Sequence, residues 1–336
     1  MLEFTTFSFY KYFKIENTEH FRAQLFEGLK SLKVLGRVYI AEEGINGQVT
    51  CYKELFDQVR NFIYCMPGLG DLRLNIAIEE KGQSFKKLHV KVRKKIVADG
   101  IDDITFDVTQ RGKYLKAEEF NEMSEDPQVL IVDMRNHYEY AVGHFENAIG
   151  LKAETFREAL PEAKLLLSGA EGRPIILYCT GGIRCEKASA WLKHNGFQKV
   201  FQVEGGIIEY TRRAKFLGIP NKFKGVNFVF DDRLGETITH EIISRCQQCS
   251  NPTARQVNCA NDGCHLLFIQ CETCGKSFNN CCSTVCQSVL ALPDVIQNQI
   301  RSGLSKGRMV HGYFKKRSGI SRKTSNKSVS LSSLIC

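Results

Sequence analysis

One segment of the chain combines residue types and spacing suited to thiol chemistry: Tyr178-Cys-Thr-Gly-Gly-Ile-Arg-Cys-Glu-Lys187. An apolar run precedes it and a helical pattern follows. Cys179 is therefore expected at the carboxyl end of a buried strand, where open α/β sheets bind ligands. The glycine pair allows a tight loop whose N–H groups point inward, and Arg184 adds a positive charge. We predict that Cys179 has a low pKa and acts as a nucleophile, with Arg184 stabilising developing negative charge. The expected backbone donors of this loop are Thr180, Gly181, Gly182 and Ile183.

The alternative for Cys179 is a structural cysteine beside an ordinary glycine turn, which the combination of two glycines and an arginine disfavours. A second thiol, Cys185, opens the following helix. It could resolve an oxidised or persulfidated Cys179, or it could fill the core, and we favour the structural role.

A second group of thiols lies in the last third of the chain, where nine of the 14 cysteines fall between residues 246 and 286. In a reducing compartment, clustered thiols bind metal more often than they form disulfides, and four closely spaced pairs suit two tetrahedral zinc sites. Four thiolates leave no open position on the metal, so we expect structural zinc. The predicted ligands are Cys246, Cys249, Cys259, Cys264, Cys271, Cys274, Cys282 and Cys286.

The pairs could combine in two ways, first with third and second with fourth, or sequentially. Cys281 is an alternative to Cys282, and His265 is a further alternative ligand. Disulfides formed on oxidation are the competing interpretation.

Composition limits the function classes. Hydrophobic residues make up 43% and charged residues 25%, as in folded globular domains. No apolar run approaches the roughly 18–20 residues of a membrane span, and the first residues lack a secretory pattern, so a cytoplasmic protein is expected. The net charge of +9 resides in residues 301–336, which hold nine Lys/Arg and no acid. This basic tail is expected to be disordered and suits a polyanion partner.

Residues 1–100 show the order βαββαβ, with helical spacing at 19–32 and 54–65. This order predicts a ferredoxin-like, or acylphosphatase-like, α+β domain. Its last strand, expected at 87–97, is strongly basic and alternates charged with apolar residues, so the charges share one face. We interpret this face as an RNA-binding surface, and a merely solvated strand face is the alternative. The residues concerned are Lys86, Lys87, Lys91, Arg93, Lys94 and Lys95.

After an expected linker at 101–115, helices alternate with apolar strands to about residue 215. The continuous apolar run at 129–133, a second buried strand expected at 174–179 and a third strand expected at 199–203 predict a parallel sheet in an α/β domain. The predicted domains are 1–100, 101–222, a Cys-rich zinc module at 223–300 and the basic tail at 301–336.

Three segments of this central domain resemble the rhodanese family: Cys179-x-x-Gly182-x-Arg184, the Asp-x-Arg…Glu…Gly-His pattern at 133–144, and Val203-Glu-Gly-Gly-Ile207. The resemblance covers about 100 residues, and it implies the rhodanese fold and cysteine persulfide chemistry. The polar residues of the second segment are interpreted as ties between loops rather than as catalytic groups. They are Asp133, Arg135, Glu139 and His144.

Beyond the rhodanese segments, Ala41-Glu-Glu-Gly-Ile-Asn-Gly47, the basic strand Phe85-Lys-Lys-Leu-His-Val-Lys-Val-Arg93 and the Cys-rich end are similar to the bacterial oxygen-dependent tRNA uridine-34 hydroxylases. This resemblance covers about residues 5–290. It implies a tRNA anticodon stem-loop as substrate, O₂ as co-substrate, and 5-hydroxyuridine at position 34 as product. Thiolate addition at C6 of uracil would make C5 electron-rich, which suits Cys179 to that reaction.

Two other functions compete with hydroxylation. A rhodanese sulfurtransferase would use the same Cys179 with thiosulfate or a persulfide donor. A non-catalytic RNA-binding adaptor would not need the cysteine, the glycine pair and Arg184 together. The segment Val203-Glu-Gly-Gly does not fit a dinucleotide fingerprint, so no flavin or nicotinamide site is expected.

Overall fold

The aromatic-rich start of the chain forms a strand inside a five-stranded sheet of order β4-β1-β3-β2-β5. The computed structural model describes residues 3–79 and 82–302. Alternation along β1 turns Phe7 and Phe9 toward the helices, where both are buried in the core with Leu25 of α1 and Ile63 of α2. The elements are β1 (Phe4–Tyr12), α1 (Thr18–Ser31), β2 (Leu35–Ala41), β3 (Gly44–Tyr52), η1 (Lys53–Leu55), α2 (Phe56–Cys65), β4 (Asn75–Ile76) and β5 (Leu88–Val92).

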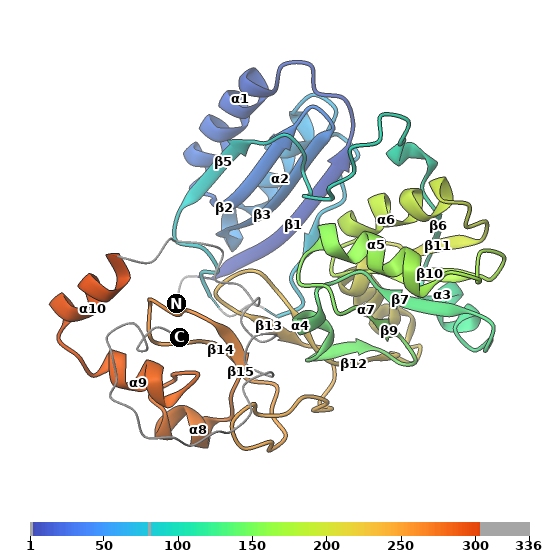
Figure 1. Cartoon of the computed structure of the whole chain (residues 1–336). Helices are drawn as coiled ribbons and strands as arrows, with labels where there is room; N and C mark the ends of the chain where they lie inside the picture. Colours follow the sequence, from blue (N-terminus) through green and yellow to red (C-terminus); the bar gives the residue numbers. More distant parts are fainter. Residues whose placement is uncertain (1–2, 80–81, 303–336) are drawn as a thin grey trace. The chain divides into compact units, whose positions relative to one another are not determined.

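Both helices cover one face of this sheet, and four of its strands have the ferredoxin-like order, as predicted (Figure 1). β5 adds a fifth strand, parallel to β2. The strands expected at 71–79 and 87–97 are shorter in the structure. β4 has two residues and pairs with β1 alone, so an extended pattern in the sequence overstated the paired length.

A second sheet, β6-β11-β10-β7-β9, is parallel throughout. α5 and α6 pack on one of its faces and α3 and α7 on the other, which gives the predicted α/β arrangement. The elements are η2 (Val108–Gln110), β6 (Lys113–Leu115), α3 (Ala117–Met123), β7 (Leu130–Asp133), α4 (His137–Tyr140), β8 (Gly143–Phe145), β9 (Ile149–Gly150), α5 (Phe156–Leu166), β10 (Ile175–Tyr178), α6 (Ile183–His194), β11 (Val200–Val203) and α7 (Gly206–Leu217).

The expected linker at 101–115 is partly structured. Lys113–Leu115 forms edge strand β6 against β11. The strand was not predicted because three residues are too few to show the alternation of apolar and polar residues typical of a strand. Its formation depends instead on pairing with β11, which is distant in the sequence.

Two strands follow the parallel sheet: β12 (Phe223–Phe228) pairs with β8 and with β13 (Gly235–Thr237). They belong to a first compact unit that extends to His240, and a second begins at Glu241. The second unit contains β14 (Gln256–Asn258), β15 (Leu267–Ile269), α8 (Glu272–Ser277), α9 (Thr284–Leu290) and α10 (Asp294–Ser302).

From residue 303 on, the predicted basic tail lies outside the described residues. Among the helices of residues 3–79 and 82–302, none has the length and hydropathy needed to cross a bilayer.

Candidate active site and metal clusters

The Cys179 loop connects the end of β10 to the start of α6, as the sequence indicates. Gly182 precedes the helix with a φ of +99°, a conformation that favours glycine. A Cβ at this position would lie 2.6 Å from the hydroxyl oxygen of Tyr10, so side-chain volume is excluded as well. The loop therefore needs glycine for two reasons, its backbone conformation and its close approach to β1.

The sulfur of Cys179 lies inside a ring of donors. Gly182 N–H donates to Sγ at 3.1 Å. Burial alone raises the pKa of the thiol, but a hydrogen bond from the Cys185 side chain, the charge of Arg184 and the backbone N–H groups of residues 185 and 184 outweigh it. The pKa of Cys179 is lowered to about 6, in the direction that the loop sequence predicts. At neutral pH the sulfur is a thiolate.

Thr180, Gly181 and Ile183, the other expected donors, anchor the loop through other groups. The hydroxyl of Thr180 contacts Glu139 and Arg184. The carbonyls of Gly181 and Ile183 accept hydrogen bonds from the N-terminal sheet. The sequence did not indicate the N–H groups of residues 184 and 185 as donors, because their direction depends on how α6 begins.

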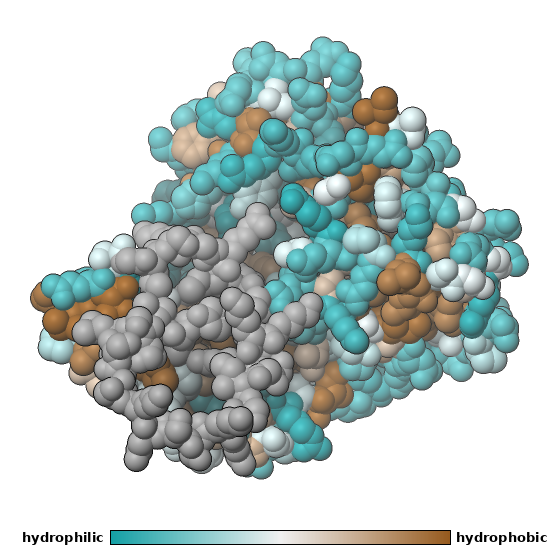
Figure 2. Space-filling view, in the orientation of Figure 1, coloured by the Kyte–Doolittle hydropathy of each residue, from teal (hydrophilic) through white to brown (hydrophobic). Residues whose placement is uncertain are grey.

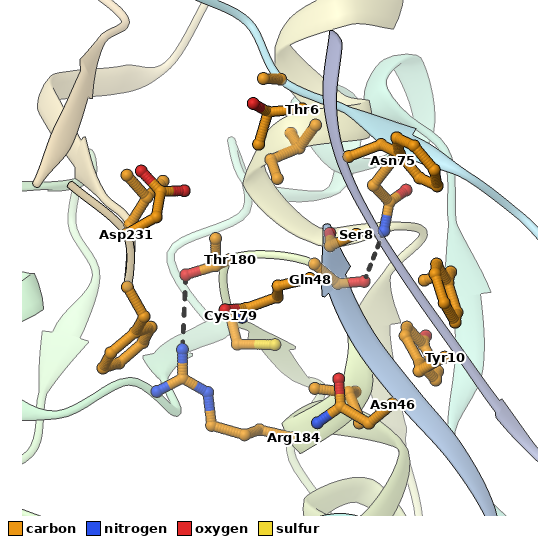
Figure 3. Close-up of a pocket in the computed structure, with 18 of the residues that line it drawn as sticks. Thr6, Ser8, Tyr10, Asn46, Gln48, Asn75, Cys179, Thr180, Arg184 and Asp231 are labelled. Atoms are coloured by element: carbon orange, nitrogen blue, oxygen red, sulfur yellow. Dashed lines mark hydrogen bonds between the residues drawn. The ribbon is translucent and has the colours of Figure 1, made fainter. Parts of the chain in front are cut away.

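Arg184 is held by Glu139. Its guanidinium donates to both carboxylate oxygens, at 2.7 and 3.0 Å. It also donates to the hydroxyl of Thr180, as Figure 3 shows. The carboxylate of Glu139 is fully buried, and the Arg184 charge outweighs that burial and lowers its pKa. Arg184 is thereby oriented beside the sulfur as half of an ion pair.

The other polar residues of the rhodanese-like segment at 133–144, which are Asp133, Arg135 and His144, make contacts within the central domain. Arg135 is fully buried and donates to Asp133 and to the carbonyl of Gly143. The Nδ1 atom of His144 lies 2.9 Å from the carbonyl of Tyr140. These contacts tie the strand end to the neighbouring loops.

Cys185 is fully buried among the apolar residues between α6 and the parallel sheet. Burial and the hydrogen bond to Cys179 raise its pKa well above the usual range, so Cys185 is a neutral donor to the thiolate. Cys185 therefore fills part of the core and also stabilises the negative charge on the Cys179 sulfur.

We predict a pH profile from these contacts. A thiolate nucleophile with a pKa of about 6 should give an activity that rises with pH through about 6 and is level above it. Cys185→Ala removes one donor to the thiolate, so the midpoint should move upward, whereas exposed Cys65→Ala should leave it in place. The measurement is kcat/KM against pH for the three proteins, and an unmoved midpoint in Cys185→Ala would contradict the assigned contact.

A cavity of about 270 Å³ lies between the Cys179 loop and the N-terminal sheet. Cys179 is one of its lining residues and is fully buried. Such sites typically measure about 300–1,000 Å³, so this cavity has room for one small ring system. The segment after β12 closes the third side with Phe230 and Asp231.

The sheet contributes a polar wall to the cavity that the sequence did not predict. In the ladder, Asn75 pairs with Ser8, and Ser8 pairs with Gln48. One row further, Tyr10 pairs with Asn46. Directly paired residues share a face, so these side chains lie on the face opposite α1 and α2. Alternation of Thr6, Ser8 and Tyr10 with Phe7 and Phe9 was the available signal, but it could not show what this face meets.

Hydrogen bonds join this sheet to the loop and to α6. Tyr10 donates to Glu186 at 3.1 Å, and Tyr12 donates to the carbonyl of Ile183 at 3.3 Å. Lys187, only 1% exposed, donates to Glu43 and Asp99, which contact it from the N-terminal segment. Through these bonds, α6 fixes the position of the N-terminal sheet relative to the Cys179 loop, and these two elements form walls of the cavity.

The predicted RNA-binding residues lie in β5 and directly before and after it. β5 is the outer strand of the N-terminal sheet, and Figure 2 shows a hydrophilic surface over it. Lys95 differs from the others, because it is half-buried and donates to Asp99 at 2.7 Å. Arg93 lies over the ring of Tyr39, which lines the cavity, at 5.6 Å from its centroid. The exposed members are Lys86, Lys87, Lys91, Arg93 and Lys94.

The second unit gathers the predicted metal ligands into two groups, and each could hold a metal ion. The sulfurs of Cys246, Cys249, Cys271 and Cys274 lie within 4.8 Å of one another, and so do those of the second group. The first pair thus joins the third, and the second joins the fourth. The second group is Cys259, Cys264, Cys282 and Cys286.

The sulfur spacing fits a metal better than disulfides. Cys249 and Cys271 have their sulfurs 3.6 Å apart, and Cys264 and Cys282 have theirs 3.7 Å apart. Tetrahedral zinc with Zn–S bonds of about 2.3 Å places sulfurs about 3.8 Å apart, whereas a disulfide requires about 2.05 Å. Cys281, buried and outside both groups, is the spare thiol.

Comparisons with known protein families match three consecutive segments of the chain. Residues 4–96 match the UPF0176 acylphosphatase-like domain, residues 116–213 the rhodanese-like domain, and residues 224–287 the rhodanese C-terminal family. A solved structure of the Alr3790 protein from Anabaena is 24% identical, with a TM-score of 0.27, over 33% of this chain and 91% of that one.

Two curated relatives extend over most of the chain. A tRNA uridine(34) hydroxylase from Erwinia tasmaniensis is 53% identical over 307 residues, which are 91% of this chain and 88% of the relative. A protein of the same name from Sodalis glossinidius has the same identity and coverage. Because the similarity spans the N-terminal domain, the cysteine loop and the Cys-rich unit together, the chain belongs to the tRNA uridine(34) hydroxylase family.

Proposed function

We propose that this protein hydroxylates uridine 34 of tRNA at C5 with O₂, using Cys179 as nucleophile. The observation that carries the proposal is the thiolate at the wall of a cavity sized for one ring, in a chain of this family. Uridine 34 lies in the single-stranded anticodon loop, so moving its base into a cavity requires little unpairing. Because tRNA is the substrate, we place the protein in the cytoplasm.

The chemistry begins with addition of the Cys179 thiolate to C6 of uracil. A C–S bond forms, and the electron pair of the C5–C6 double bond moves into an enolate over C5 and O4. C5 then bonds to one atom of O₂, and a proton completes a hydroperoxide. Backbone N–H groups around the sulfur and the Arg184–Glu139 pair hold the nucleophile in position.

The remaining steps balance the oxygen. Two thiols of an external reductant cleave the O–O bond, which leaves a 5-hydroxyl and releases water and a disulfide. Loss of the C5 proton and cleavage of the C6–S bond restore the double bond and the thiolate. One oxygen atom of O₂ enters the product, and the other leaves as water, with two electrons and two protons supplied by the reductant.

We propose further that the exposed basic residues in β5 and on either side of it bind the phosphates of the anticodon stem-loop, and that zinc occupies both Cys₄ groups. Cys271 caps α8 and Cys286 lies in α9, so zinc in these groups would connect short helices to the β14–β15 hairpin. This connection is structural, since all four positions on each metal are taken by thiolates.

The test is nucleoside mass spectrometry of tRNA incubated with the purified protein and a thiol reductant, in air and without oxygen. We expect uridine 34 to gain one oxygen atom in air alone. Oxygen-18 gas should label the product, because the new hydroxyl comes from O₂. Unchanged tRNA under all conditions, together with a persulfide on Cys179 after treatment with thiosulfate, would instead establish a sulfurtransferase.

A further inference from the structure

The polar wall of the cavity contains two asparagines with the same arrangement. The side-chain NH₂ of Asn46 donates to the carbonyl of Ile96 at 3.1 Å, and that of Asn75 donates to the carbonyl of Gly181 at 3.3 Å. A flipped amide would place its oxygen against these carbonyl oxygens, so the main chain fixes both orientations. Each asparagine therefore has its oxygen left over as an acceptor.

The oxygen of Asn75 is buried and has no hydrogen-bond partner within the described part of the chain. The residue is 3% exposed, and buried polar atoms in folded proteins are nearly always paired. An unpaired acceptor beside a cavity is the condition expected of a group whose partner is a ligand. Asn46 lines the same cavity, and Figure 3 shows its side chain pointing toward Arg184 and the sulfur of Cys179.

Ser8 and Gln48 complete the polar wall. Both are half-buried, both line the cavity, and no hydrogen bond is recorded for either side chain among residues 3–79 and 82–302. Ser8 lies between Asn75 and Gln48 in one row of the sheet. A hydroxyl and a primary amide each offer a donor, so the wall presents two fixed acceptors and two adaptable donors.

We propose that Ser8, Asn46, Gln48 and Asn75 form a base-reading site that selects uracil through its N3–H and its two carbonyl oxygens. The inference rests on the proposed function and names the groups that choose its substrate. Uracil carries one ring N–H between two carbonyl groups, which matches an asparagine acceptor beside hydroxyl and amide donors. Cytosine has an unprotonated N3, so a fixed acceptor there would face another acceptor.

The wall has two fixed asparagine acceptors, and the N3–H of uracil needs only one of them. In a polynucleotide, the other donor of a uridine is its 2′-hydroxyl, because the 3′ and 5′ oxygens are esterified. The second fixed acceptor is assigned to this hydroxyl, which would make the site selective for RNA. The wall thus has one acceptor for each donor of an internal uridine.

The test uses anticodon stem-loops that contain uridine, N3-methyluridine, cytidine or 2′-deoxyuridine at position 34. Wild-type protein should prefer uridine over each analogue by at least about 10-fold in kcat/KM, because each analogue leaves a buried group unpaired. Asn46→Ser and Gln48→Leu should lower kcat/KM for uridine about 10- to 100-fold. Each substitution should lower kcat/KM far less for an analogue that already lacks the uridine group contacted by the substituted side chain. The preference for uridine over that analogue should therefore fall.

Asn61→Ser is the matched control, because Asn61 is an exposed asparagine on α2, away from the polar wall. It should leave rate and selectivity unchanged. Asn75→Ser tests the buried acceptor, and its Tm identifies any loss of fold. If wild-type protein hydroxylates uridine 34 but Asn46→Ser and Gln48→Leu retain wild-type rates and selectivity, the base-reading site is wrong. If wild-type protein makes no 5-hydroxyuridine, the proposed function fails first.

Discussion

Cys179→Ser is expected to reduce formation of 5-hydroxyuridine by at least about 10³-fold, the scale on which loss of a nucleophile acts. The substitution keeps the shape of the side chain but replaces a thiolate with a neutral alcohol. The hydrogen-bond donors around the sulfur and the charge of Arg184 lower the pKa of a thiol to about 6, and a serine hydroxyl starts from a far higher pKa. The serine oxygen would remain protonated and could not add to C6.

The measurement is single-turnover formation of 5-hydroxyuridine with an anticodon stem-loop in excess oxygen. Cys65→Ser, an exposed thiol at the end of α2, is the matched control and should retain the wild-type rate. Binding of the stem-loop by Cys179→Ser should stay within about threefold of wild type, because replacing the thiolate with a hydroxyl removes no positive charge that contacts phosphate. Full activity in Cys179→Ser would exclude thiolate addition.

Removal of zinc should unfold the second unit. Structural zinc contributes about 10–16 kcal/mol of apparent binding free energy, more than a unit of this size can replace by burying apolar surface. The core of the unit supports this expectation, since three of its five buried members are cysteines: Cys259, Cys281 and Cys286. The purified protein should contain two zinc ions per chain, measured by mass spectrometry under native conditions.

Single substitutions test how the ligands are divided. Cys249→Ser should lower the metal content toward one and increase hydrogen exchange around α8, while protection around α9 persists. Cys282→Ser should do the reverse. Cys281→Ser is the control, because its sulfur belongs to neither group, and it should retain two zinc ions. Loss of metal in Cys281→Ser but not in Cys282→Ser would overturn the assignment at this position.

Features with local causes could be predicted from the amino-acid sequence alone. A buried strand, two glycines and a helix follow one another within a few residues, so the place and the low pKa of Cys179 could be predicted before any tertiary contact was known. The ferredoxin-like strand order and the parallel sheet also followed from short periodic patterns. The same holds for the spacing of cysteines into pairs.

Tertiary structure decided every feature that depends on residues far apart in the chain. Glu139 reaches Arg184 across 45 positions, and Asn75 reaches Gly181 across 106. It also decided which cysteine pairs meet. The alternation of residue types along a strand predicts which face of the strand is polar, but it does not predict which other part of the protein packs against that face. In this protein the packing of the N-terminal sheet against α6 turns an ordinary polar face into the wall of a cavity, and that contact is set by the folded core as a whole.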